Sequence, residues 1–77
     1  MITLQDGRTF DGTPLQVVRQ LQQLAWQGKR SLSEYIDWVV ETTLRTETLE
    51  LSVTGTTDEE RATSLLDELV RTGLARR

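Results

Sequence analysis

Hydrophobic and polar positions follow two different periods along the chain, and the change of period predicts the order of its elements. At the start, Ile2 and Leu4 alternate with polar residues until Asp6-Gly7, and Phe10 follows. Alternation interrupted by such a turn indicates a β-hairpin. A three-residue loop with Gly7 in the left-handed conformation pairs Ile2 with Phe10 on one apolar face, whereas a two-residue turn puts them on opposite faces. We therefore expect the three-residue loop.

Two helical patterns follow the hairpin. Apolar residues recur three and four positions apart over residues 15–25 and again over 32–44, which is the spacing of one buried helix face. The residue pairs Thr13/Gln16 and Ser31/Glu34 each form the pattern of a capping box at the start of a helix. The connection between the two helices is short, so we expect them to pack as a helical hairpin or a turned pair.

The last third of the chain shows both periods. Residues 49–54 alternate strictly, which predicts a strand with one buried face, and Gly55 ends it. Another capping box, Thr57/Glu60, precedes a narrow apolar stripe over residues 62–70, and Gly73 is the expected C-cap. The predicted order is ββααβα. We expect one α+β domain over residues 1–77, with a three-stranded sheet packed against helices and an exposed sheet edge where a second copy could add.

Composition narrows the ways in which this domain is stabilised. A chain of 77 residues buries only about 60% of the surface that its unfolded form exposes. It has no Cys and no His, so disulfides and the usual metal ligands do not compensate, and self-association is the remaining route. The first residues show neither a basic signal-peptide start nor a long apolar run, so we expect a cytoplasmic protein.

Candidate chemistry is sparse. General acid–base and nucleophilic catalysis most often use His, Cys or a base-activated Ser, so the composition predicts a protein that is not an enzyme and has no cofactor or small-molecule substrate. The densest acidic cluster, Asp58 to Glu60, has the oxygen ligands of a hard cation, but it also lies where carboxylates complement a helix dipole. We favour the helix-start interpretation and expect no metal site. The terminal Arg76-Arg77 is expected to be a solvated tail.

Two tryptophans do not fit the helical stripes as well as the aliphatic residues do. At about 100° per residue, Trp38 lies well away from the apolar stripe of its helix, and Trp26 lies at the margin of its own. Trp38 either packs against the C-terminal helix or the hairpin of the same chain, or it anchors a contact with another protein, because Trp is enriched at the centres of interfaces. Trp26 and Trp38 are thus the candidate protein-interface residues.

The stretch from Leu24 to Ile36, LAWQGKRSLSEYI, resembles the joint between the two helices of ribbon-helix-helix DNA-binding proteins. In that family a helix ending in Leu-Ala leads through a Gly and a basic residue to Ser-x-Ser-Glu. The resemblance covers at most residues 1–45 and implies an intertwined dimer whose paired N-terminal strands enter the major groove. The nucleic-acid contacts that it implies are Thr3, Gln5, Lys29, Arg30, Ser31 and Ser33.

Net charge separates the two resulting hypotheses. The formal charge is −3, and residues 31–77 carry five basic side chains against ten acidic ones. A net-acidic chain is repelled by the phosphate backbone, so DNA binding would need a local basic patch. We therefore expect a non-catalytic protein-interaction or subunit module that binds a second copy of itself or another protein. The alternative is a ribbon-helix-helix-like DNA-binding regulator or antitoxin.

Overall fold

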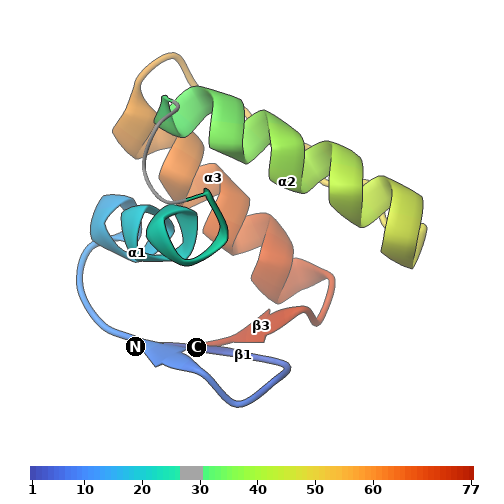
Figure 1. Ribbon diagram of the computed structural model, residues 1–77, viewed down its shortest axis with the longest axis horizontal. Coiled ribbons are helices and arrows are strands. Elements are labelled where there is room, and N and C mark those ends of the chain that lie inside the picture. Colours follow the sequence, from blue (N-terminus) through green and yellow to red (C-terminus); the bar gives the residue numbers. More distant parts are fainter. Residues whose placement is uncertain (27–30) are drawn as a thin grey trace.

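The three helices lie on one side of a small sheet (Figure 1). A computed structural model describes residues 1–26 and 31–77. The elements in chain order are β1 (Ile2–Leu4), β2 (Thr9–Phe10), α1 (Pro14–Trp26), α2 (Leu32–Glu47), α3 (Asp58–Arg71) and β3 (Ala75–Arg76). In Figure 1, α1 and α3 lie nearer the sheet, and α2 lies farther from it. The predicted α+β class, with a three-stranded sheet packed against helices, is confirmed.

The hairpin has the predicted register. β1 and β2 are antiparallel, and Ile2 pairs with Phe10, so both side chains are buried on the helix side of the sheet. The Leu4 N–H donates to the Arg8 carbonyl at 2.8 Å, and this bond closes a three-residue loop. Gly7 has φ +92° there, a conformation that costs glycine little and other residues more. The left-handed turn residue thus sets which face Phe10 occupies.

The third strand is not the predicted one. Residues 49–54 form no strand, and the sheet order is β2-β1-β3, with β3 pairing antiparallel to β1. The element order is therefore ββαααβ rather than ββααβα. Arg76 and Arg77 are exposed, as expected of solvated residues, but they are not a free tail, because Arg76 belongs to β3 and Arg77 pairs with Asp67 of α3. A two-residue strand is too short for alternation to reveal it.

Residues 49–54 show the predicted alternation of buried and exposed side chains, but the segment 49–56 forms hydrogen bonds with a helix instead of a sheet. Leu51 is buried and its neighbours on either side are exposed. The backbone N–H groups of Ser52, Thr54 and Thr56 donate to Glu68 Oε1, Ser64 Oγ and Glu60 Oε1, at 2.8, 3.0 and 3.0 Å. The donors are two residues apart in the extended segment, and the acceptors are four residues apart on α3. These distances match, because two extended residues span about 6.6 Å and four helical residues rise about 6 Å. The segment therefore runs antiparallel to α3 along a row of side-chain acceptors.

The helix starts follow the predicted capping residues. Thr13 and Gln16 bond reciprocally at the start of α1, and Thr57 and Glu60 form a complete capping box at the start of α3. At the start of α2, Ser31 Oγ accepts the Glu34 N–H at 3.1 Å. The Gly73 N–H donates to the Val70 carbonyl and the Leu74 N–H to the Leu69 carbonyl, which is the Schellman arrangement. It turns the chain from α3 into β3.

The core lies between the sheet and the helices, and every helix contributes to it. Its largest fully buried side chains are Val17 and Val18 of α1, Ile36 of α2 and Leu65 of α3. The sheet adds Ile2, Phe10 and Ala75, all less than 9% exposed. α3 contacts both other helices and β3, so it is the element on which the rest of the fold assembles.

Candidate functional site

The outer face of α2 is the surface that folding explains least. The first half of the helix turns Leu32, Tyr35 and Ile36 into the core. Trp38 lies two residues beyond Ile36, a rotation of about 200°, and so it points away from the core side. It is 40% exposed. The prediction that this ring lies off the apolar stripe is confirmed.

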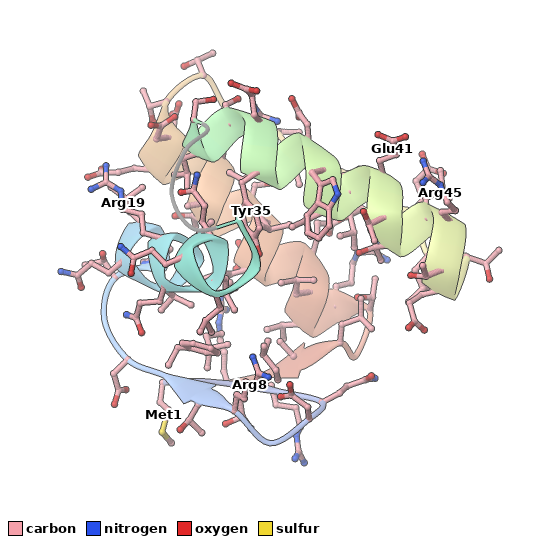
Figure 2. The ribbon with its side chains drawn as sticks, viewed as in Figure 1. Met1, Arg8, Arg19, Tyr35, Glu41 and Arg45 are labelled. Carbon is pink, nitrogen blue, oxygen red and sulfur yellow. The ribbon has the colours of Figure 1, made fainter. Side chains whose placement is uncertain are left out.

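Trp38 stacks beside an aromatic ring of its own helix. The centroids of the Tyr35 and Trp38 rings are 5.9 Å apart, and the ring planes are tilted by 30°. Tyr35 lies between α2 and α1 (Figure 2), and burial raises the pKa of its hydroxyl to about 12. The buried Tyr35 ring thus supports one side of Trp38, and this contact limits the rotamers that the exposed indole can adopt.

Beyond Trp38, Val39 and Val40 are partly buried against the core, and the end of α2 is exposed. Leu44 is 50% exposed, and the residues from Leu44 to Glu47 are all exposed. The Arg45 guanidinium lies 2.6 Å from Glu41 Oε1, and both side chains are about 70% exposed (72% and 68%). Figure 2 shows Glu41 and Arg45 side by side on the side of α2 that faces away from α1. We call Trp38, Glu41, Thr42 and Arg45, which recur at helical spacing, the outer face of α2.

The predicted interface residues are thus placed unequally. Trp38 packs against Tyr35 of its own helix and keeps a large exposed surface. Its role in binding a partner stays a prediction. Trp26 is the last residue of α1, and its side chain lies outside the described part of the structure.

The residues implied by the ribbon-helix-helix resemblance occupy two separate places. Thr3 lies in β1, where both edges of the strand are paired within the chain, to β2 and to β3. The Gln5 amide donates to the Gly73 carbonyl at 3.3 Å. Within the described part of the chain, β2 and β3 are the edge strands, so any pairing of this sheet between subunits would use one of them.

The helical joint provides the other implied contacts. Ser31 is the N-cap of α2, and Ser33 Oγ accepts a hydrogen bond from Arg61 of α3. Lys29 and Arg30 lie outside the described residues. Ser33 is thus already bonded within the chain.

Two arginine-centred contacts were not predicted from the sequence. The Arg61 guanidinium bonds Ser33 Oγ and lies 2.6 Å from Asp37 Oδ1, so it ties α3 to α2. Its side chain is only 20% exposed. Asp37 and Arg61 are far apart in sequence, and nothing in the spacing of either residue indicates their partner.

Glu68 is the other centre of polar contacts. Its carboxylate accepts hydrogen bonds from Arg71 at 2.7 and 3.0 Å and from the Ser52 N–H. The Arg71 hydrogen bonds, followed by the Ser52 bond, lower the pKa of Glu68 to about 2. Glu68 and Arg71 lie three residues apart on the helix, a spacing at which surface ion pairs are weak, but the Glu68 side chain is only 15% exposed and holds residues 49–54 in place.

The acidic start of α3 serves the helix itself. Glu60 accepts the Thr56 and Thr57 N–H groups, and the Thr56 bonds lower its pKa. A groove of about 490 Å³ runs beside it, lined by Thr54, Gly55, Glu59, Glu60, Thr63, Ser64 and Asp67. Across the described residues, no group of three acidic side chains is placed to hold a metal ion. No helix in the described ranges is long and apolar enough to span a membrane.

Comparison with known proteins adds no relative from which a function could be transferred. No protein-family model, curated protein or solved structure matches the chain. The outer face of α2 therefore has to be interpreted from its own chemistry.

Proposed function

We propose that this chain is a non-catalytic protein-interaction module whose contact surface is the outer face of α2. The observation that carries the proposal is Trp38, a large aromatic ring that is 40% exposed and is supported by a buried tyrosine. Indole rings at interface centres contribute large apolar area together with one hydrogen-bond donor. Leu44 adds a second exposed apolar side chain on the same helix.

Charge supports a protein partner over a nucleic acid. The outer face carries one acidic and one basic side chain, Glu41 and Arg45, and these are paired with each other. A surface with no net charge does not attract a phosphate backbone, whose binding depends on clustered cations. Such a surface fits the mixed composition of a protein interface, where an apolar centre is surrounded by paired polar groups.

A mass measurement on matched variants tests the proposal. The native chain should show a concentration-dependent mass above 8.8 kDa in sedimentation equilibrium, and Trp38→Ser should abolish the increase. Leu24→Ser is the matched control, because Leu24 is 60% exposed but lies on α1. An unchanged native-like mass in Trp38→Ser, or an equal loss in Leu24→Ser, would contradict the assignment of this face.

A DNA titration separates the proposal from the regulator alternative. We expect no change in the fluorescence anisotropy of labelled mixed-sequence duplex DNA at moderate salt. Affinity that falls steeply as salt rises would contradict the proposal and support the ribbon-helix-helix reading, because that dependence reports release of counterions from phosphate.

A further inference from the structure

We infer that the partner of the outer face of α2 is a second copy of the same chain, bound antiparallel about a two-fold axis. This inference rests on the proposed function and specifies its geometry. In a two-fold interface the same surface serves both subunits, so the surface must be complementary to itself. The outer face of α2 meets that requirement through its charges.

The complementarity comes from the order of the charges along the helix. Glu41 precedes Arg45 by one helical turn, and both point away from α1 (Figure 2). If two copies of α2 run antiparallel with the axis midway between these positions, Glu41 of each copy faces Arg45 of the partner subunit. Two intermolecular ion pairs then join the two intramolecular ones in a ring of four alternating charges, and rim charges of this kind fix the register of an interface.

The same arrangement covers the exposed indole. Trp38 lies three residues before Glu41, so the antiparallel register places it opposite the partner's Thr48, directly after the last turn of the partner's α2. That turn is exposed in the single chain, from Leu44 through Glu47. The exposed C-terminal end of α2 in one copy therefore covers Trp38 of the other.

The size of this surface predicts a weak dimer. A stable interface buries about 800 Å² on each partner, which is roughly one sixth of the 5048 Å² that the whole chain exposes. One helix face supplies less than this. We therefore expect a reversible dimer with a dissociation constant of roughly micromolar order, at the low end of specific interfaces.

Charge reversal and charge exchange test the register. In Arg45→Glu or Glu41→Arg, the two-fold symmetry creates two like-charge contacts, so the dimer dissociation constant should rise at least about tenfold. The double variant Glu41→Arg/Arg45→Glu restores opposite charges across the axis and should bring the constant back to within about threefold of native. Arg8→Glu is the matched control, because it reverses an exposed, ion-paired arginine in the hairpin loop, away from α2.

The outcomes separate this inference from the proposed function. Sedimentation equilibrium measures the constant, and circular dichroism melting confirms that each variant is folded. A Trp38-dependent dimer that ignores both single reversals, or a double variant that stays dissociated, overturns the register and leaves the interaction face standing. A native chain that stays monomeric up to roughly millimolar concentration overturns both the homodimer and the proposed contact surface.

Discussion

Helices α2 and α3 have similar lengths, 16 and 14 residues, and each starts with a side-chain cap, but they use their surfaces differently. α3 buries four apolar residues, and its flanks bind α2 through Arg61 and residues 49–56 through Glu60, Ser64 and Glu68. α2 buries three apolar residues near its start and leaves Trp38 and Leu44 exposed. Contacts within the fold account for the polar residues of α3, but they do not account for the exposed apolar residues of α2.

This difference separates polar residues that serve folding from apolar residues that the fold leaves exposed. An acidic cluster such as that of α3 can suggest a ligand site, but the bonds from the Thr56 and Thr57 N–H groups show a structural role for Glu60. The Trp38 indole contacts Tyr35 within the chain, yet it stays 40% exposed. The unexplained surface therefore lies on α2.

The largest expected effect is in the core stripe of α3. Leu65 is fully buried, so Leu65→Ala should lower the free energy of unfolding by about 2–5 kcal/mol. Leu44→Ala makes the same change on the exposed part of α2 and should alter it by no more than about 0.5 kcal/mol. Urea denaturation of both variants measures the contrast. Similar losses at the two positions would show that α2 is packed as fully as α3.

Low pH should weaken the contacts between α3 and residues 49–54. The pKa of Glu68 is about 2 when folded, below its ordinary value of 4.5, so protonation favours the unfolded chain. Its stabilising contribution is complete above about pH 4.5 and declines as the pH falls toward 2. Glu68→Gln should therefore be less stable than native at pH 7 and should lose less stability on acidification.

Urea denaturation between pH 7 and pH 2 checks this prediction. Glu47→Gln is the control, because it removes the same charge from an exposed position at the end of α2. If Glu68→Gln and the control follow the same pH profile as the native chain, the Glu68 contacts do not hold residues 49–54.

The smallest expected effect is at the end of α2. Thr48 has φ +54° and is the non-glycine residue with a left-handed backbone among those described. Such a conformation disfavours a β-branched residue and suits glycine at a helix end. Thr48→Gly should therefore raise the free energy of unfolding by up to about 1 kcal/mol. A decrease would mean that the Thr48 side chain makes a stabilising contribution larger than this strain.

Local signals in the sequence predicted the parts of the fold that depend on neighbouring residues. The Asp6-Gly7 turn set the Ile2–Phe10 register, and the Thr13 and Thr57 capping boxes placed two helix starts. These features involve residues within a few positions of each other. The sequence is sufficient where the contact is local.

The strand over residues 49–54 was mispredicted because alternation reports only that one face is buried. It does not show which partners form hydrogen bonds with the backbone N–H and C=O groups of the segment. Here the N–H groups of Ser52 and Thr54 bind side chains of α3, and that pairing depends on the helix lying beside the segment. β3 was missed because two residues after a helix cap show no period.

The candidate site was only partly accessible from the sequence. Helical periodicity placed Trp38 off the core stripe, and the structure confirms its exposure. The packing of its ring on Tyr35 could have been suspected from their spacing of three residues, which is a contact distance on a helix. The Glu41–Arg45 pair and Trp38 could be assigned to one exposed face of α2 only once the buried side of the helix was known.

Sedimentation equilibrium of the native chain over a wide concentration range tests the central claim most directly. The account predicts a mass that rises from 8.8 kDa toward twice that value as the concentration passes roughly micromolar levels, and that stays at 8.8 kDa in Trp38→Ser. A native mass that stays at 8.8 kDa at every concentration, or a Trp38→Ser variant that dimerises like the native chain, would contradict it.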